Sequence, residues 1–538
     1  MENKHGKRLP HLIDSIPSEA KRNRISMYTI ALEGWRRGLN LNFYSYINNN
    51  KLDIKYSLNS PGRIHHFEGS GGDLNTEKAI EICDDKALTK TQLKSTAVPT
   101  PHGKSFENNK TISEIMDHAK TLYFPLVVKP TDGSGGKGVV SNIKDNKELK
   151  EALLYLRDTL GFQSLIVEEY VPGEEIRVFI VGDNVLAAVK RIPANVIGDG
   201  INPISKLIEM KNELRKSIPH LYFRPIKLDS TVKKTIHAAG YTLDSVPKQD
   251  ERIFLRTTSN ISTGGDPIDV TEKITNEQKK TAIKAVKSIP GLVHCGVDMV
   301  ITNEDDTPVI LELNTRPGLG SHLFPVEGEA RDIPKAIIDL YFPNTKGIST
   351  ERSNVFFDFQ KIKESLIAGS TKAIEVFPAE KNKLIAKRYI INTSIDAIEF
   401  YQWLNKRVLN LNLNGFIEQV DEENIEIVIA GKTENDIRSF SDLIGSRRFK
   451  SQIFNITKEY WGSPIKLGFE IKNDYLFKSN KELENEIEDI KKKMKQTKKE
   501  DNLLNQRINM IQNSRMWKMT SPLRNLGGKI KKCGRIFE

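Results

Sequence analysis

Hydrophobic positions follow two periods along this chain of 538 residues, and together they predict a protein of mixed helices and strands. In residues 22–38, Ile25, Tyr28, Leu32 and Trp35 recur at helical spacing, and Gly38 is a candidate C-cap. Helical patterns are also expected at 75–96, 203–245 and 276–288. Short apolar runs predict strands at 41–46, 55–58, 124–129, 164–168, 185–190, 295–301 and 310–314.

The run Ile310–Gly318 places polar side chains inside an apolar strand. Side chains alternate between the faces of a strand, so Glu312 and Asn314 point to the same side. Asp298 lies within the apolar run before it. Carboxylates are costly to bury there unless a cation accompanies them, and such oxygen ligands suit Mg²⁺ (or Mn²⁺) held together with phosphates. The alternative is a pair of edge strands whose acids are solvated.

A glycine-rich loop follows the strand that ends in Lys129. Glycines let backbone N–H groups approach an anion closely, and a serine and a lysine in the loop add donors. The spacing differs from that of a P-loop, and no helix follows directly. We therefore predict a hairpin that closes over nucleotide phosphates. Its residues are Gly133, Ser134, Gly135, Gly136, Lys137 and Gly138.

Other charged residues stand where predicted elements end. Lys86 and Lys90 are four residues apart and share a helix face, for which a solvated surface is the alternative. Glu168 and Glu169 end a strand, where acids beside exposed backbone can meet an adenine amino group and ribose hydroxyls; an ordinary hairpin is the alternative. Lys190–Arg191 precede a loop punctuated by glycines, which suits an anionic substrate.

Composition describes a globular protein of several domains, with 38% hydrophobic and 28% charged residues. No run of about 18 apolar residues predicts a transmembrane helix, and the N-terminus does not resemble a signal peptide. Three scattered cysteines fit a reducing cytosol and offer neither a zinc site nor a disulfide framework. We therefore expect a cytoplasmic protein.

The net charge of +11 is unevenly placed. Residues 476–538 hold 16 Lys and Arg against 8 Asp and Glu, which is a net charge of +8 and leaves +3 for the rest. The basic character therefore belongs to a tail, and it argues for a partner of that tail and against a nucleic-acid-binding enzyme.

The region after residue 345 predicts a linker and then a second compact domain. Residues 346–384 read as linker with one helix at 357–368. The next elements are a strand at 387–392, a helix at 397–410, strands at 415–420 and 425–430, a helix at 434–446 and a strand near 464–469. This is the βαββαβ order of a ferredoxin-like unit.

Beyond it, apolar positions from Leu483 to Ile511 alternate at spacings of four and three, with weak positions at Thr497 and Asp501. This pattern favours a coiled coil that pairs with itself, and an isolated solvated helix is the alternative. The segment after it is basic and contains Trp517, so it could touch an anionic membrane face. It is similar to tails of some bacterial polysaccharide glycosyltransferases.

The ordered motifs of residues 75–345 resemble those of ATP-grasp carboxylate–amine ligases. The likeness is greatest to the ATP-grasp module of cyanophycin synthetases and more distant to bifunctional glutathione synthetases. The motifs that carry it are Asp85–Lys90, Val128–Pro130, Gly133–Gly138, Glu168–Arg177, Arg191–Gly200, Ser259–Gly265, Gly296–Asp298 and Glu312–Gly318.

This resemblance implies roles for individual residues. Asp298, Glu312 and Asn314 would hold Mg²⁺, and the glycine-rich loop would cover the phosphates of ATP. The residues expected to bind ATP outside that loop are Lys86, Lys129, Glu168, Glu169, Tyr170, Val171, Glu175, Arg177 and Lys190. The residues expected to hold the acid substrate and the transferring phosphate are Arg191, Arg256, Asn260 and Arg316, together with Arg177.

The βαββαβ unit resembles acylphosphatases, but its catalytic parts are missing. The family's loop is rich in glycine and ends in an arginine that binds phosphate, whereas residues 392–401 contain no glycine and end in Tyr401. The family's asparagine that orients water falls at Gln419. Without these groups phosphate binding loses its main electrostatic contribution, so we predict an inactive domain.

These features predict a multidomain α+β and α/β protein. Its parts are an N-terminal α/β region (1–74), an ATP-grasp domain (75–345), a linker (346–384), an acylphosphatase-like domain (385–472), a coiled coil (473–513) and a basic tail (514–538). The expected function is ATP- and Mg²⁺-dependent ligation of a carboxylate to an amine of an amino acid, peptide or amino sugar, including one on a cell-surface polymer. The alternative is a catalytically silent nucleotide-binding scaffold that acts through the acylphosphatase-like domain and coiled coil. Expected partners are small carboxylate and amine substrates, a second copy of the chain, and a membrane or polysaccharide machinery at the tail.

Overall fold

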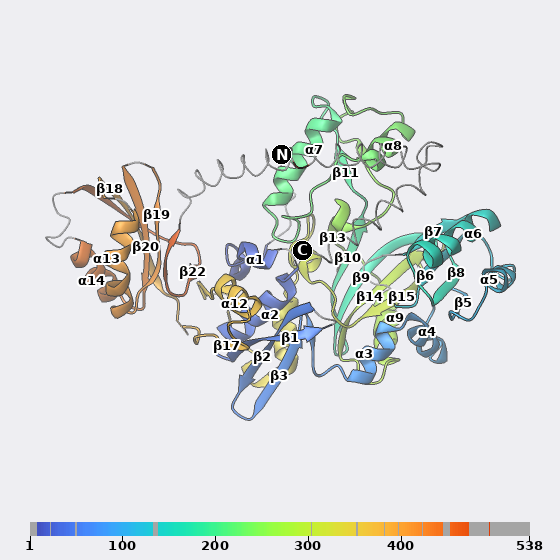
Figure 1. Ribbon diagram of the computed structural model, residues 1–538, viewed down its shortest axis with the longest axis horizontal. Coiled ribbons are helices and arrows are strands. Elements are labelled where there is room, and N and C mark those ends of the chain that lie inside the picture. Colours follow the sequence, from blue (N-terminus) through green and yellow to red (C-terminus); the bar gives the residue numbers. More distant parts are fainter. Residues whose placement is uncertain are drawn as a thin grey trace, which may run out of the picture. The chain divides into compact units, whose positions relative to one another are not determined.

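The computed structural model describes residues 8–472 and residue 494, apart from residues 22, 49–50, 133–137, 303, 351–352, 381, 396, 422 and 445–451. The chain divides into two compact units (Figure 1). The first holds the chain up to Ala386 with the returning segments Ala430–Ile437 and Gly462–Gly468, and the second holds the remainder. The predicted coiled coil and basic tail lie outside the described residues, residue 494 excepted.

The N-terminal part is one five-stranded sheet packed against a buried helix. Helix α2 (Ile25–Arg36) is buried along nearly its whole length, as the apolar spacing of that segment predicts. Aromatic rings from the helix and from strand β1 form a shared cluster that includes Tyr28, Trp35 and Phe43. The strand order is β17-β1-β2-β3-β4, with bounds β1 (Asn40–Asn48), β2 (Lys51–Ser60), β3 (Arg63–Glu68), β4 (Gly71–Gly72) and β17 (Ala373–Glu375).

Residues 346–384, expected to be a linker, instead complete this N-terminal sheet. Strand β17 pairs antiparallel with β1, and helix α12 (Phe359–Ile367) packs on β1 and β2. Phe357 and Phe359 join the aromatic cluster, and Trp35 Nε1 donates to the Phe377 carbonyl at 2.7 Å. The segment has too few apolar residues to form a core alone. Its partners lie more than 300 positions earlier, which local sequence patterns do not reveal.

A four-stranded sheet of order β5-β8-β6-β7 follows. Leu126, Val128, Leu165 and Val167 face helices α5 and α6 on one side and form the core there. The alternate positions, Lys129 among them, face the other side because side chains alternate along a strand. The bounds are β5 (Gly103–Phe106), β6 (Leu126–Pro130), β7 (Val140–Ile143), β8 (Leu165–Glu169), α5 (Ile112–Ala119) and α6 (Asn146–Leu154).

The second sheet of this region has the order β13-β10-β9-β14-β15. One face packs on α9 through residues such as Val178, Val297 and Met299. Three neighbouring strands place Arg177, Asp298 and Glu312 side by side in register on the other face. The bounds are β9 (Gly173–Val181), β10 (Asn184–Ile192), β13 (Asp266–Asp269), β14 (His294–Thr302), β15 (Pro308–Asn314), α3 (Glu77–Asp84), α9 (Asn276–Lys287), α10 (Gly320–Leu323) and α11 (Ile333–Tyr341).

An insertion between β10 and β13 forms a small core of its own. Its apolar side chains gather around Ile204, Val232 and Ile253. Arg215 and Lys211 both bind the carboxylate of Asp266, which ties the insertion to β13. The bounds are β11 (Asn195–Ile197), α7 (Ile204–Lys216), α8 (Ser230–Ala238) and β12 (Arg252–Phe254).

The second unit has the element order β18, α13, β19, β20, α14, β21, which is the predicted βαββαβ order. The fourth strand, however, is Ile453–Tyr460 (β21), not residues 464–469. β21 is an exposed edge strand, so it lacks the apolar alternation that marks a strand in sequence. Residues 464–469 form parts of β22 (Ile465–Lys466), paired with β16 (Val355–Phe356), and β23 (Phe469–Lys472), paired with β19.

The strands of this unit are ordered β21-β18-β20-β19-β23. The remaining bounds are β18 (Ile385–Thr393), α13 (Ala397–Asn410), β19 (Asn414–Gln419), β20 (Asn424–Gly431) and α14 (Glu434–Ile444). The specific likeness to acylphosphatases stays a prediction.

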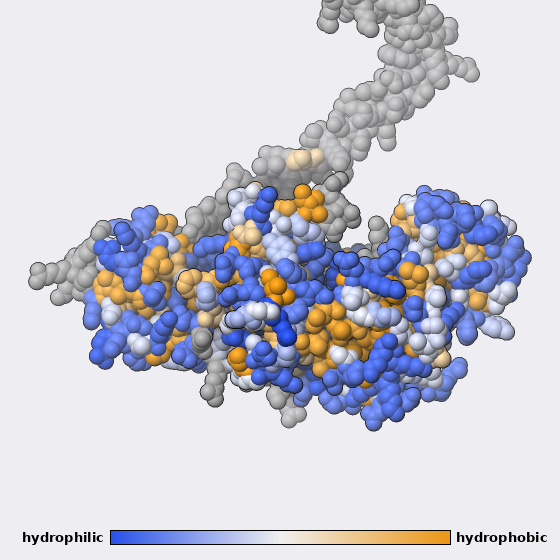
Figure 2. All heavy atoms as spheres, turned by 90° about the horizontal axis from the view of Figure 1, so that it is seen from below, coloured by the Kyte–Doolittle hydropathy of each residue, from blue (hydrophilic) through white to orange (hydrophobic). Residues whose placement is uncertain are grey.

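Hydrophilic side chains cover much of the surface visible in Figure 2, with hydrophobic side chains exposed between them. Within the residues described above, none of the helices has both the length and the apolar character needed to cross a bilayer.

Candidate active site

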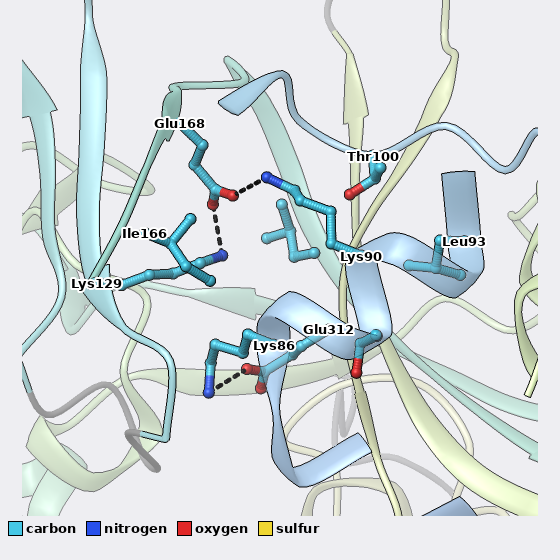
Figure 3. A pocket seen from close by; sticks show the side chains of 10 residues that line it. Lys86, Lys90, Leu93, Thr100, Lys129, Ile166, Glu168 and Glu312 are labelled. Carbon is cyan, nitrogen blue, oxygen red and sulfur yellow. Dashed lines mark hydrogen bonds and ion pairs between the residues drawn. The ribbon is translucent and has the colours of Figure 1, made fainter. Parts of the chain in front are cut away.

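Helix α4 (Lys86–Ser95) supplies the first part of the site. Asp85 caps the helix, because its carboxylate accepts hydrogen bonds from the backbone N–H groups of Ala87 and Leu88. The cap fixes where the helix begins, and one turn then separates Lys86 from Lys90. Both lysines line a pocket between the two sheets of this region, as the shared helix face predicts (Figure 3).

The polar face of the four-stranded sheet brings two lysines to one buried carboxylate. Lys129 Nζ lies 2.5 Å from Glu168 Oε1, and Lys90 Nζ lies 2.6 Å from Glu168 Oε2. Burial raises the pKa of Glu168, but Lys129 and Lys90 outweigh that effect and hold it below its usual value. Burial lowers the pKa of Lys90, and Glu168 opposes that shift.

These lysines border a small, partly open pocket. Lys86 Nζ lies 3.9 Å from Glu312 Oε2, so the pocket joins the two sheets through α4 (Figure 3). Three ammonium groups around two carboxylates suit a polyanion such as a nucleotide triphosphate. The lining residues are Lys86, Thr89, Lys90, Leu93, Thr100, Lys129, Ile166, Glu168, Leu311 and Glu312.

The five-stranded sheet provides the acid cluster. Arg177 binds Asp298 with two hydrogen bonds of 2.5 Å, and Arg191 Nη2 lies 3.5 Å from Asp298 Oδ1. Burial raises the pKa of Asp298, but Arg177 and Arg191 hold it well below its usual value. Burial, followed by the charge of Asp298, raises the pKa of Glu312. The two carboxyl groups therefore interact directly, and a further cation would neutralise their negative charge.

This donor set fits a divalent cation. Asp298 and Glu312 are neighbours in register, and Asn314 follows on the same strand. Asn314 Oδ1 accepts a hydrogen bond from the Arg316 backbone N–H at 3.0 Å, which orients its amide. No cluster of three or more His, Cys, Asp or Glu side chains suited to a metal occurs among the described residues, so the predicted set relies on one amide oxygen.

Several other residues predicted for the site form contacts away from the Asp298 cluster. Arg316 binds Glu68 and Asp84, Arg256 binds Asp229 and the Thr263 carbonyl, and Lys190 pairs with Glu174. Each of these cations therefore pairs with a carboxylate that does not belong to the Asp298 cluster. Sequence patterns do not show such pairings, because the carboxylate partners lie 16 to 248 positions away.

Other predicted residues have structural contacts in this state. Asn260 caps a 3₁₀ turn by accepting from Ser262, and Glu169 accepts from the Tyr123 backbone N–H. The backbone N–H of Tyr170 donates to Pro125, and the neighbouring Val171 is half-buried. Burial raises the pKa of Glu175, an effect that Arg191 opposes. Of the glycine-rich loop, Gly138 is described and has a φ of 75°, while residues 133–137 lie outside the described part.

Lys90 is the residue whose importance the sequence understated. We expected it to share a face with Lys86 but did not assign it to a nucleotide site. Its hydrogen bond to Glu168 spans 78 positions, so the local signals are its spacing of four from Lys86 and its place in the motif Asp85–Lys90.

Two sheets thus border one pocket with their charged faces, with lysines on one side and paired acids on the other. Residues 83–199 and 255–327 match the family model of the RimK-like ATP-grasp domain. This match supports the predicted resemblance to ATP-grasp ligases for this part of the chain.

Individual proteins are similar to parts of this chain. The chain is 35% identical over 272 residues to cyanophycin synthetase of Trichormus variabilis, covering 49% of this chain and 30% of that protein. It is 30% identical over 335 residues to the glutathione biosynthesis bifunctional protein GshAB of Clostridium perfringens, covering 59% and 41%. The structure of a bifunctional glutathione synthetase from Pasteurella multocida has 26% identity and a TM-score of 0.44, covering 56% of this chain and 41% of that one. The chain thus spans less than half the length of these relatives.

Proposed function

We propose that this chain is an ADP-forming ligase that uses ATP and a divalent cation to join a carboxylate to an amine. The observation that carries the proposal is the convergence of Lys86, Lys90 and Lys129 on one pocket beside Glu312. Such a set of cations offsets the charge of a transferring phosphoryl group, and positioning supplies most of the remaining catalysis. The match to the ATP-grasp family model supports it.

In this reaction an oxygen of the substrate carboxylate attacks the γ-phosphorus of ATP, and ADP leaves. The amine then attacks the acyl carbon, and inorganic phosphate leaves. Lys86, Lys90 and Lys129 hold phosphate oxygens. Arg177 and Arg191 orient the carboxylate substrate, with Arg256, Asn260 and Arg316 as candidates once their present contacts are released. No nucleophilic side chain is required.

Asp298, Glu312 and Asn314 would hold Mg²⁺ or Mn²⁺, which supplies charge neutralisation for the phosphates when bound. Tyr170, Val171, Glu169 and Glu175 would border the adenosine, and the glycine-rich loop would exclude water from the acyl phosphate.

The test is release of ADP by the purified chain with Mg²⁺ and ATP, across pairs drawn from amino acids, short peptides and amino sugars. A product joined through a new amide, identified by mass spectrometry, would establish the ligase. A chain that binds ATP but releases no ADP with any pair, nor with a cell extract, would support the scaffold alternative. Coupled hydrolysis of ATP without a joined product would contradict both.

The remaining proposals rest on the sequence. Residues 473–513 pair two or more copies of the chain, and residues 514–538 contact an anionic membrane face. A proline at Leu504, in the apolar seam, should dissociate the oligomer in light scattering. Sedimentation with phosphatidylserine vesicles tests the tail, and salt should abolish that binding.

A further inference from the structure

Most of the insertion between β10 and β13 lies outside the matched ATP-grasp sequence. The family model matches residues 83–199 and 255–327, and helices α7 and α8 with the turn between them fall in the gap. Its turn at residues 217–224 nevertheless reaches back to the active-site region. There Ile218 and Leu221 pack with Ile261, Phe324 and Val326, which fixes the turn against the segment that includes α10. Helix α10 itself packs on β10, the strand that carries Arg191.

Hydrogen-bonded polar side chains connect the turn to α10. His220 Nε2 lies 3.1 Å from Ser321 Oγ on α10, and His220 Nδ1 lies 3.2 Å from Arg224 Nη1. Arg224 also donates to the backbone carbonyl of His220. Position 320 allows this approach because it is glycine: a Cβ there would lie 2.2 Å from His220 Nδ1. The backbone of α10 is therefore shaped to admit the imidazole.

The direction of these hydrogen bonds follows from their chemistry. Burial, together with the charge of Arg224, lowers the pKa of His220 well below its usual value, so the ring is neutral. A guanidinium only donates, so Nδ1 must accept from Arg224 and the single ring proton lies on Nε2. Nε2–H then donates to Ser321 Oγ. The hydrogen of the Ser321 hydroxyl is left to donate to another acceptor.

The surroundings favour an anionic acceptor. Helix α10 carries Ser321 and packs on β10, which carries Arg191, and Arg191 lies 3.5 Å from Asp298 in the acid cluster. Ser321 and His220 are half-buried, so a ligand can reach this end of the site. A hydroxyl donor on a helix that packs against the strand of an arginine suits a carboxylate.

We propose that Arg224, His220 and Ser321 form a relay through which the insertion presents the Ser321 hydroxyl to a carboxylate of one of the ligase substrates. The inference rests on the proposed function, because it assigns substrate recognition to that reaction. Ser321 binds the carboxylate, while His220 and Arg224 are positioning residues. The carboxylate belongs either to the acid that is activated or to an acid group on the amine substrate.

Kinetics with the productive acid and amine pair test the relay in the full chain. Ser321→Ala and His220→Leu should each raise KM for one substrate about tenfold, the effect of one hydrogen bond to a charged group. KM for ATP and kcat should not change. The double variant should be no worse than either single one, because both remove the same donor. Whether the KM of the acid or of the amine rises identifies which substrate carries the carboxylate.

Two further variants make the kinetic test discriminating. His220→Gln should stay near wild type, since its amide N–H can replace Nε2–H. Ser217→Ala, on the same turn, should change nothing because Ser217 bonds the Leu214 carbonyl. Additive effects in the double variant, an equal loss in His220→Gln, or unchanged KM values in Ser321→Ala would overturn the relay.

The tautomer of His220 tests the relay without any turnover, and so separates its failure from that of the ligase proposal. Long-range ¹H–¹⁵N spectra of the full chain labelled at histidine, assigned with His220→Gln, should show a neutral ring with the proton on Nε2 at pH 7. In Arg224→Met this preference should be lost. A proton on Nδ1 in the wild-type chain would overturn the relay whether or not the chain is a ligase.

Discussion

Two sheets of this chain each carry an arginine and acids on neighbouring strands, yet their surroundings differ. In the five-stranded sheet β13-β10-β9-β14-β15, Arg177 and Asp298 are largely enclosed and Glu312 lies against them. In the sheet of the second unit, Arg388 pairs with Glu426 and with the more exposed Glu459. The first cluster keeps an acid with a raised pKa, whereas in the second the acids pair with Arg388, whose side chain is 32% exposed.

The difference shows that charge on a sheet face favours a ligand where neighbouring acids are not neutralised by one another's partners. Enclosed acids gain from an added cation, because little water screens them. Exposed pairs contribute little to stability and do not call for a ligand.

The largest expected effect comes from the matched pair Asp298→Asn and Glu426→Gln. Asp298→Asn leaves Arg177 without its carboxylate and removes a metal ligand. ADP formation should fall by about 10³-fold, and unfolding free energy by about 3 kcal/mol. Glu426→Gln should leave ADP formation unchanged and cost less than about 1 kcal/mol. ADP assays and thermal unfolding of the full chain measure both; equal effects on ADP formation would remove the contrast between the sheets.

A second pair compares lysines. Lys129→Met should weaken ATP binding and lower ADP formation by about 100-fold, because the phosphates lose a charged donor. Lys458→Met is the control, since Lys458 bonds Ser441 in the second unit. It should match wild type in calorimetric titration with ATP. Tight ATP binding by Lys129→Met would show that Lys129 does not hold the phosphates of ATP.

The raised pKa of Glu312 predicts a pH dependence of the metal-free chain. A carboxyl whose pKa is higher in the folded state contributes stability below its unfolded pKa, and that stability is lost as pH rises through the folded pKa. Relative to Glu312→Gln, the wild-type chain should therefore lose melting temperature as pH rises above about 4.5, the ordinary pKa of the group.

Bound Mn²⁺ should reverse this trend, because it stabilises the ionised form. Affinity for Mn²⁺ with ATP should accordingly fall as pH falls through the same range, in wild type but much less in Glu312→Gln. A melting difference between the two chains that does not vary with pH would show that Glu312 has an ordinary pKa.

The smallest effect is expected in the second unit. Acetyl phosphate and benzoyl phosphate should be hydrolysed by the full chain at the background rate, because residues 392–401 lack glycine and a phosphate-binding arginine. Hydrolysis above background that Tyr401→Phe abolishes would show an active acylphosphatase. The second unit would then also contain a catalytic site.

The sequence by itself determined the parts of this protein whose signals are local. Short apolar runs located β6, β14 and β15, and helical spacing of apolar residues located α2 and α9, because the side chains that these elements bury are apolar. Asp298 and Glu312 stood out as acids inside apolar strands. The ordered motifs predicted a resemblance to ATP-grasp domains, and the family model of that domain matches much of the same part of the chain.

Tertiary structure alone decided which distant groups meet. In the structure Lys90 pairs with Glu168, and Arg316 pairs with Glu68. Residues 346–384, expected to be a linker, contribute a strand to the N-terminal sheet. The tertiary structure also placed the fourth strand of the second unit at Ile453–Tyr460 and brought His220 to Ser321. Each of these depends on residues far apart along the chain, and the energy of a contact depends on distance and burial in space, which one-dimensional periodicity does not encode.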